Sequence, residues 1–308
     1  MHDERMHGKS GDGVEEGVHA LTVGSESAMV DTPRRSNLRD MTTAPSHEFD
    51  LADDLAIAHR MADVADALSM SRFRAVDLIV DTKPDLTPVS EADRAVERAL
   101  RDMIADERPG DSVLGEEFGE DGASRRQWIL DPIDGTKNYV RGVPVWATLI
   151  ALVDDGEIIV GVVSSPPLGR RWWASRGEGA FVREPGADQP RRLQVSRVSA
   201  LSDASVSLSD QAGWAERGAA GGLRALLSQT WRQRAYGDFW SHMLVAEGAV
   251  DIAAEPQLAS YDMAALVPIV HEAGGAMTSF TGGPAISGGC AVTTNGLLHG
   301  DVLALLHE

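Results

Sequence analysis

The sequence predicts a layered α/β fold, and three observations indicate it. Apolar residues recur at helical spacing over residues 51–68 and again over residues 262–273. Two apolar runs, residues 145–153 and 157–164, are separated by a short Asp-Asp-Gly turn, which is typical of a β-hairpin. Strand-like and helical patterns then alternate through the second half of the chain. Helices packed on sheets would bury the apolar faces of both kinds of element.

The first elements are predicted within residues 50–110. Asp50 is a candidate N-cap for a helix over residues 51–68. A short strand is expected at residues 78–80, followed by a polar loop that contains two prolines. A second helix should begin at Ser90 and end near Asp106, just before a Pro-Gly pair.

The remaining elements follow the hairpin. Residues 171–174 should continue the antiparallel meander, and a strand at residues 231–235 leads to a helix from about Asp238. Pro268 lies inside the helix over residues 262–273 and should kink it. We also expect strands at residues 193–195, 205–208, 251–254, 276–279 and 291–294, a helix within residues 214–227 and a final helix from Gly296.

Residues 1–46 differ from the rest of the chain. They are rich in Gly, Ser, Asp, Glu and His and show no sustained apolar periodicity. Because such a segment cannot bury enough apolar surface to fold, we expect a disordered N-terminal tail. The chain has 308 residues, of which 43% are hydrophobic, so the remainder is long enough for one large domain or two small ones.

The net charge is −19, from 28 basic and 47 acidic residues. This excess of acidic residues argues against a nucleic-acid partner, since Lys and Arg bind phosphate backbones. The negative charge can also serve only to keep the protein in solution. The single cysteine, Cys290, excludes an internal disulfide and a cysteine-based zinc cluster and is expected to be buried. No apolar run reaches the roughly 18 residues that span a bilayer, and no signal-peptide core is present. We therefore expect a cytoplasmic protein with no membrane partner.

Two acidic residues follow a short apolar strand at the centre of the sequence. Residues 128–130 are Trp-Ile-Leu, and Asp131 and Asp134 come directly after them. Pro132 lies between the acids and ends the strand, because it has no N–H group to donate. Gly135 permits a tight turn behind them. Two carboxylates that converge at a strand end are the kind of oxygen ligands that Mg²⁺ prefers.

Further acids lie at other element ends. Glu116 and Glu117 follow the apolar pair Val113-Leu114, and Asp262 opens a predicted helix. Plainer interpretations exist for each, because a Glu-Glu pair is commonly a solvated turn and an Asp before a helix is commonly an N-cap. The acids at residues 131 and 134 are harder to explain in this way, since a carboxylate beside an apolar strand is costly to desolvate without a partner.

The motifs in order resemble those of the inositol monophosphatase family of Mg²⁺-dependent, lithium-sensitive phosphatases. The motifs are Gly-Glu-Glu at residues 115–117, Asp-Pro-Ile-Asp-Gly-Thr at 131–136, Tyr-Asp-Met-Ala-Ala at 261–265 and Glu-Ala-Gly-Gly at 272–275. They cover roughly residues 50–308. Residues 140–146 and 235–239 are similar to those of the histidinol-phosphate phosphatases within this family, found in actinobacteria.

The resemblance implies a fold and an organisation. The family fold is an alternating α-β-α-β-α sandwich of the inositol monophosphatase and fructose-1,6-bisphosphatase type. The phosphatase domain would then cover residues 47–308, with a metal-binding subdomain to about residue 190 and a C-terminal subdomain from about residue 191. Family members are commonly dimers, so the resemblance also suggests a homodimer.

The resemblance also implies a set of metal ligands. Glu116, Asp131 and the carbonyl of Ile133 would hold one Mg²⁺ ion. Asp131, Asp134 and Asp262 would hold a second, and a third, weaker ion would bind near Glu116. The implied cofactor is therefore Mg²⁺, with two to three ions per site.

The resemblance implies catalytic roles for residues around these ligands. Water would attack the phosphorus directly, and Glu116 together with the pair Thr136 and Asp93 would accept its proton. The N–H groups of Gly135 and Thr136 would receive phosphate oxygens, and Lys83 matches a lysine kept near the metals. On sequence alone, Asp93 is more simply an acid favoured by the dipole of the helix that it opens.

The substrate question concerns charge. Asp238 and Glu255 match positions that contact the alcohol part of the substrate in this family. Histidinol carries an ammonium group and a titratable imidazole, which two carboxylates would attract, whereas inositol is neutral. Asp238 is also an adequate N-cap, and Glu255 would suit either alcohol. We therefore expect hydrolysis of L-histidinol phosphate in histidine biosynthesis, with an inositol-1-phosphatase or a broader sugar and nucleotide phosphatase as the alternative.

A third hypothesis is a catalytically silent protein that binds a phosphorylated ligand. It would require a broken metal set, whereas the complete set of acids is present. Other enzyme classes find no support, because the sequence lacks the G-x-S-x-G, G-x-x-x-x-G-K-[ST] and H-E-x-x-H motifs.

Overall fold

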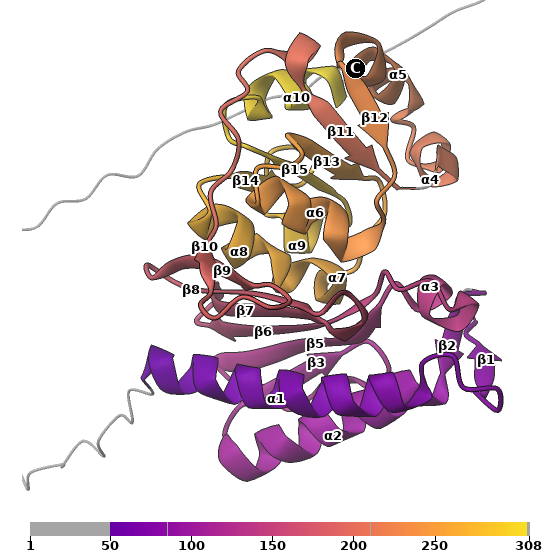
Figure 1. Cartoon of the computed structure of the whole chain (residues 1–308), viewed down its shortest axis with the longest axis vertical. Coiled ribbons are helices and arrows are strands. Elements are labelled where there is room, and N and C mark those ends of the chain that lie inside the picture. The colour runs from indigo at the N-terminus through magenta and orange to yellow at the C-terminus, as the bar shows by residue number, and fades with distance from the viewer. Residues whose placement is uncertain (1–49, 85, 210, 307–308) are drawn as a thin grey trace, which may run out of the picture. The chain divides into compact units, whose positions relative to one another are not determined.

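A computed structural model of the protein describes residues 50–84, 86–209 and 211–306, so the predicted tail, residues 1–46, lies outside the described residues. Within the described part, helices and sheets alternate in five layers (Figure 1). Two helices cover one face of an eight-stranded sheet, further helices separate that sheet from a five-stranded sheet, and more helices cover the last face. The predicted α-β-α-β-α sandwich is confirmed.

The first layer consists of α1 (Leu51–Arg72) and α2 (Glu91–Glu107). Asp50 caps α1, as predicted, by accepting a hydrogen bond from the backbone N–H of Ala52. Ser90 caps α2, and the Asp93 carboxylate returns to the backbone N–H of Ser90, which completes a capping box. The strand expected at residues 78–80 lies two residues later. It is β1 (Val80–Thr82), which pairs with β2 (Pro88–Ser90) in a small antiparallel ribbon.

The eight-stranded sheet has the order β10-β9-β8-β7-β6-β5-β3-β4. Neighbouring strands are antiparallel except β3 and β5, which are parallel. The predicted hairpin is confirmed as the antiparallel pair β6 and β7. The strands are β3 (Ser112–Gly115), β4 (Gly119–Asp121), β5 (Arg126–Asp134), β6 (Ala147–Asp154), β7 (Glu157–Ser165), β8 (Arg170–Ser175), β9 (Gly179–Arg183) and β10 (Arg191–Arg192).

The five-stranded sheet has the order β12-β11-β13-β15-β14, and its first two pairs are parallel. Its strands are β11 (Ser205–Leu208), β12 (Arg232–Arg234), β13 (Ile252–Glu255), β14 (Ala276–Thr278) and β15 (Ala291–Thr294). The helices that accompany the two sheets are α3 (Thr136–Arg141), α4 (Gln211–Glu216), α5 (Ala220–Gln229), α6 (Asp238–Ala246), α7 (Ser260–Ala264), α8 (Leu266–Glu272), α9 (Ala285–Gly288) and α10 (His299–Leu306), with short 3₁₀ turns η1 (Pro166–Leu168) and η2 (Leu201–Asp203).

Three apolar cores join the layers. The first lies between α1, α2 and the large sheet and includes Met61, Leu100 and Trp128. A second runs from the opposite face of that sheet through α6 and α8 to the smaller sheet, and a third joins the smaller sheet to α5 and α10. The second core is the one that fixes α6 and α7, the helices that carry candidate site residues, against the large sheet.

The prediction of one kinked helix over residues 262–273 is wrong. The structure has two helices, α7 and α8, which meet at Ala265 rather than forming one kinked helix. Pro268 explains the break, because it cannot donate an N–H group and its ring clashes with the carbonyl of Ala264, four residues earlier. The helical segment also begins two residues before Asp262.

The junction of α7 and α8 lies directly on the large sheet at Gly161 of β7. A Cβ atom added at Gly161 would lie 2.4 Å from the carbonyl oxygen of Ala265 and 2.6 Å from Cγ of Pro268. Only glycine therefore allows this approach of backbone to backbone. The contact brings α7, and with it Asp262, against the strands β5 and β6.

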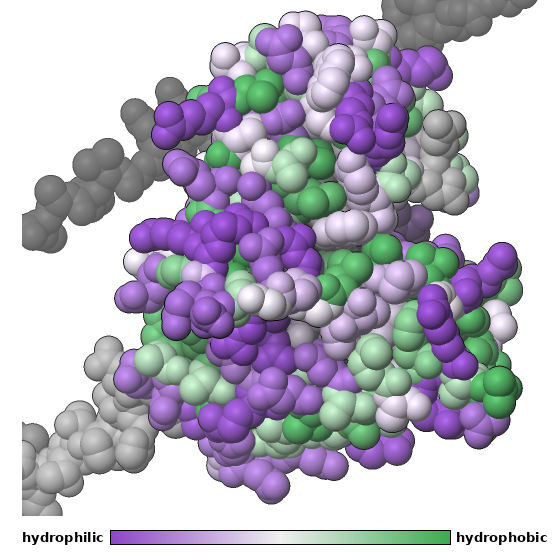
Figure 2. Space-filling view, viewed as in Figure 1, coloured by the Kyte–Doolittle hydropathy of each residue, from purple (hydrophilic) through white to green (hydrophobic). Residues whose placement is uncertain are grey.

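Hydrophilic side chains gather on the face where β8, β9 and β10 lie (Figure 2). Arg170 and Arg191 from these strands form ion pairs with Glu184 and with Glu247 at the end of α6. These pairs tie the edge of the large sheet to the helical layer above it. None of the described helices has the length and apolar character needed to cross a membrane.

Candidate active site

Three carboxylates from two distant parts of the chain meet at the end of β5. Asp131, Asp134 and Asp262 each offer one oxygen, and these oxygens lie within 4.8 Å of one another. Asp131 is only 1% exposed, whereas Asp134 and Asp262 are half-buried. The turn after Leu130 and the start of α7 therefore face the same point.

The local fold of β5 directs the first two acids. The register of β5 against β6 is irregular between Asp131 and Asp134, which lets both side chains reach one side. Oδ1 of Asp131 accepts a hydrogen bond from the N–H of Ile133 at 3.0 Å. The carbonyl of Pro132 accepts one from the Thr148 hydroxyl at 2.8 Å, which holds the irregular segment on its neighbour strand.

The three carboxylates oppose one another electrostatically. Burial, followed by the charge of Glu116, raises the pKa of Asp131 well above its usual range. Burial, followed by the charge of Asp238, does the same to the pKa of Asp134. The pKa of Asp262 rises to about 7, chiefly through burial. A hard divalent cation among these oxygens would relieve the repulsion, so the donor set fits such an ion.

Glu116 lies beside this cluster but outside the group of three. Its carboxylate pairs with the ammonium of Lys83 at 2.7 Å, and Lys83 also pairs with Glu117 at 2.6 Å. Both glutamates are half-buried, so the solvated-turn interpretation is wrong. Burial is the main cause that raises the pKa of Glu116, while Lys83 acts to lower it. The predicted Lys83 therefore lies next to the acids as a counter-charge.

Thr136 and Asp93 are brought together from α3 and α2. The Thr136 hydroxyl lies 3.2 Å from Oδ1 of Asp93 and 2.9 Å from the carbonyl oxygen of Ile133. Asp93 is fully buried, and its other oxygen accepts from the hydroxyl and N–H groups of Ser90. Asp93 thus both caps its helix and contacts Thr136. The carbonyl of Ile133 faces the threonine.

Gly135 allows the turn that joins these groups. Its φ of 84° lies in the left-handed region, and a Cβ atom there would lie 2.9 Å from the carbonyl oxygen of Val145 and 3.1 Å from Oδ2 of Asp238. The short helix α3 begins immediately afterwards. Gly135 therefore lies against Asp238, directly after the acid at residue 134.

Asp238 has an unusual backbone conformation. Its φ is +44°, which is uncommon for a residue with a side chain. The N-cap of α6 is Gly237, so the N-cap interpretation of Asp238 is wrong. Oδ2 of Asp238 accepts a hydrogen bond from Nδ2 of Asn138 at 2.8 Å. The backbone N–H group of the following residue, Phe239, donates a hydrogen bond to the carboxylate of Asp134 at 2.7 Å. The start of α6 is thereby tied to the acidic cluster.

Glu255 lies at the end of β13 and is 6% exposed. Burial and then the charge of Glu255 raise the pKa of Asp238 to about 6. The charge of Glu255 also acts on Asp134 and Asp262. Asp238 and Glu255 therefore form a second acidic pair, adjacent to the first cluster.

Three residues at the site were not singled out from the sequence. Asn138 holds Asp238, and His242 bonds Glu255. Glu97 is fully buried and accepts the N–H groups of Glu117 and Phe118, which holds the turn after Glu116. Glu97 follows Asp93 by four residues on one helix face, so its spacing could have revealed it. Nothing in the local sequence marks the other two.

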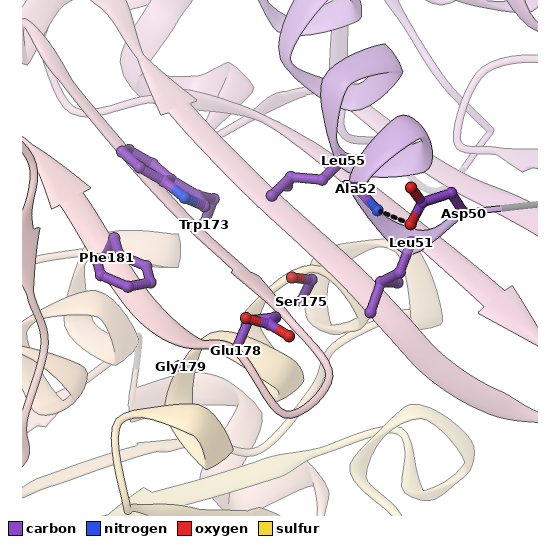
Figure 3. Close-up of a pocket in the computed structure, with 9 residues that line it drawn as sticks. All are labelled: Asp50, Leu51, Ala52, Leu55, Trp173, Ser175, Glu178, Gly179 and Phe181. Carbon is purple, nitrogen blue, oxygen red and sulfur yellow. Dashed lines mark hydrogen bonds between the residues drawn. The ribbon is translucent and has the colours of Figure 1, made fainter.

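A separate cavity of about 290 Å³ lies between the start of α1 and strands β8 and β9 (Figure 3). Trp173 and Phe181 stack beside it at 6.0 Å, and Leu55 points toward them. Asp50 at its rim is engaged in capping α1. The cavity contains none of the predicted site residues, so the acidic cluster remains the candidate site.

Comparison with known proteins places the chain in a family. Residues 50–308 match the model of the inositol monophosphatase family. The chain is 59% identical to the histidinol-phosphatase of Mycobacterium tuberculosis (strain H37Rv), over 83% of this chain and 98% of that protein. It is 54% identical to the histidinol-phosphatase of Streptomyces coelicolor, over 84% of this chain and 98% of that protein.

The fold agrees with this match. An inositol monophosphatase structure from Zymomonas mobilis superposes with a TM-score of 0.74 at 31% identity, over 84% of this chain and 100% of that chain. The chain therefore belongs to the inositol monophosphatase family.

Proposed function

We propose that this protein is a Mg²⁺-dependent phosphomonoesterase that hydrolyses L-histidinol phosphate to L-histidinol and phosphate. The observation that carries the proposal is the second acidic pair, Asp238 and Glu255, beside the three-carboxylate cluster. The three-carboxylate cluster would bind the metal ion that acts on the phosphate. The neighbouring pair would attract the positively charged alcohol of the same ester. The identity to two histidinol-phosphatases supports the same substrate.

The metal-binding part of the proposal assigns ligands. Asp131, Asp134 and Asp262 would hold Mg²⁺, and Glu116 with the Ile133 carbonyl would complete a set for two to three ions. Mg²⁺ supplies Lewis acidity and charge neutralisation for phosphate-ester hydrolysis. Phosphate monoesters hydrolyse extremely slowly in water, so neutralised charge and an aligned nucleophile are both needed.

The residues of the chain would handle the proton of the attacking water. The Thr136 hydroxyl donates a hydrogen bond to Asp93 or to the carbonyl of Ile133, which leaves a lone pair on its oxygen to accept a hydrogen bond from water. Glu116, which forms an ion pair with Lys83, is the carboxylate proposed to receive the proton. Direct attack by water leaves no phosphoenzyme.

The rest of the site would bind the two ends of the substrate. The N–H groups of Gly135 and Thr136 lie at the start of α3, where backbone N–H groups lack an intrahelical carbonyl partner, so they suit phosphate oxygens. Asp238 and Glu255 would bind the ammonium or imidazolium of histidinol. A hydrogen bond to a charged group contributes about 1.5–3 kcal/mol, which is enough to select a cationic alcohol over a neutral one.

A phosphate-release panel tests the proposal. The purified chain with Mg²⁺ is assayed on histidinol phosphate, inositol-1-phosphate and fructose-1,6-bisphosphate, and we expect kcat/KM to be highest for histidinol phosphate. A preference of about tenfold or more for inositol-1-phosphate, equivalent to roughly 1.4 kcal/mol, would favour the inositol-1-phosphatase alternative instead. Inactivity on every ester after Mg²⁺ is restored to a metal-free preparation would favour the silent-protein hypothesis.

A further inference from the structure

His242 is a buried titratable residue that the proposed chemistry does not use. It lies on α6, four residues after Asp238, and is 1% exposed. The ring contacts Glu255 directly and interacts electrostatically with Asp238, so it lies beside the second acidic pair.

Both ring nitrogens of His242 have partners. Nδ1 lies 2.7 Å from the hydroxyl oxygen of Thr293 on β15, and Nε2 lies 3.0 Å from Oε1 of Glu255 on β13. An ionised carboxylate can only accept, so Nε2 must carry the proton. Thr293 can then donate its hydroxyl proton to Nδ1. With a proton on Nε2, the ring satisfies every group in this chain of hydrogen bonds.

Glu255 has one oxygen engaged in this chain. Within the described part of the protein, His242 is the side chain that donates to Oε1, and no described residue donates to Oε2. Glu255 is almost fully buried, and its charge acts to raise the pKa values of Asp238, Asp134 and Asp262. A buried carboxylate needs a hydrogen-bond donor to compensate for the loss of water around it.

We propose that His242, fixed by Thr293, is a positioning residue that holds Glu255 as an oriented carboxylate and so creates the two-acid subsite for a cationic alcohol. The inference rests on the proposed function, because it concerns the same substrate end. It assigns His242 to substrate selection and not to the hydrolytic step. A merely structural histidine would affect all substrates alike.

Two substitutions of His242 separate these roles. His242→Phe keeps a ring but removes both polar nitrogens, whereas His242→Gln retains an N–H group that can reach Glu255. We expect His242→Phe to raise KM for histidinol phosphate by about tenfold or more, with KM for inositol-1-phosphate and both kcat values nearly unchanged. His242→Gln should recover most of the lost affinity. Equal changes on both substrates, or no advantage of Gln over Phe, would overturn the proposal.

A measurement without substrate tests the hydrogen-bond chain itself. In protein labelled with ¹⁵N-histidine, two-bond ¹H–¹⁵N spectra distinguish the two neutral tautomers, and His242→Gln assigns the signal by its loss. We expect the proton on Nε2 in the wild type. A proton on Nδ1 alone would overturn the proposal, because Nε2 could then not donate to Glu255. A wild type that prefers inositol-1-phosphate would refute the proposed function, while the tautomer still decides whether His242 holds Glu255.

Discussion

Buried acids at the two ends of the large sheet have different surroundings. Asp54, near the start of α1, is fully buried and pairs with the guanidinium groups of Arg126 at 2.8 Å and Arg108 at 3.2 Å. Among the described residues, Asp131, Asp134 and Asp262 form no ion pair with Lys or Arg. Asp54 is therefore a structural acid, whereas the cluster at the end of β5 has the electrostatics of a cation site.

Asp238→Asn tests the cation-binding pair. The substitution keeps the shape of the side chain but removes its charge, so KM for histidinol phosphate should rise by about 10- to 100-fold, as expected for a lost charge-assisted hydrogen bond. KM for a neutral phosphate ester should change much less. Steady-state kinetics on both substrates measures this, with the exposed Asp188→Asn as a matched control. Equal effects on both substrates would refute the cation-binding role.

Thr136→Val tests the proton-handling pair. Valine keeps the branched shape and removes the hydroxyl that contacts Asp93 and the Ile133 carbonyl. We expect kcat to fall by about 100-fold or more, because the hydroxyl would orient the attacking water for loss of its proton, with a small change in KM. Asp93→Asn should lower kcat in the same direction. A loss that appears only in KM would show that the hydroxyl binds substrate instead.

At the scale of single residues, the sequence indicated acids that the structure brings together, but it did not indicate the side chains that contact them. The motif order identified Asp131, Asp134 and Asp262, because chemistry restricts the residue type at each position. Asn138 and His242 act through contacts with residues 100 and 13 positions away, respectively. Such partners depend on tertiary packing, so local spacing carries no signal for them.

At the scale of elements, the approach of α7 and α8 to β7 decides where Asp262 lies. Gly161→Ala would place a methyl group 2.4 Å from the Ala265 carbonyl oxygen, so the helices must shift. We expect a loss of about 1–3 kcal/mol in the free energy of unfolding, as for an overpacked core, together with weaker Mg²⁺ binding. Urea denaturation and calorimetric Mg²⁺ titration measure the two effects.

Gly110→Ala is the matched control, because no atom lies within 4 Å of a Cβ atom at that position. It should change neither the stability nor the affinity for Mg²⁺ by much. A Gly161→Ala variant that is destabilised but binds Mg²⁺ normally would show that this contact supports the fold without placing Asp262.

Element types were predictable where periodicity was strong, as for α1, α2 and the β6–β7 hairpin. The ends of the elements were less predictable. The sequence predicts a kink at Pro268, whereas the helices separate at Ala265. The break lies earlier in the chain because a proline disrupts the helix on its N-terminal side, up to four residues away. The pairing order of the five-stranded sheet could not be derived from local patterns, since its neighbours are distant in sequence.

At the scale of the whole molecule, the layers bring residues from α2, β5, α6, β13 and α7 to one point. The sandwich was predictable from the resemblance rather than from propensity, because motif order encodes a topology that local preference does not. The subdomain boundary near residue 190, the homodimer and the cytoplasmic location stay predictions.

Without metal, the protonation of Asp262 should stabilise the fold more at about pH 6.5 than at about pH 8.5, while the lowered pKa values of His59, His271 and His299 act in the opposite direction. The folded-state pKa of Asp262, about 7, lies above its unfolded value, so the folded state takes up a proton as the pH falls and gains stability. The titration of Asp262 contributes about 1 kcal/mol to the free energy of unfolding between pH 6.5 and pH 8.5, or a few degrees in Tm.

Mg²⁺ binds the ionised carboxylates, so the stabilisation that it provides should be larger at the higher pH. Thermal melts in EDTA and in millimolar Mg²⁺ measure both effects. Asp262→Asn should flatten the pH dependence in EDTA and reduce the response to Mg²⁺; an unchanged response in that variant would mean that the stabilising ion binds elsewhere.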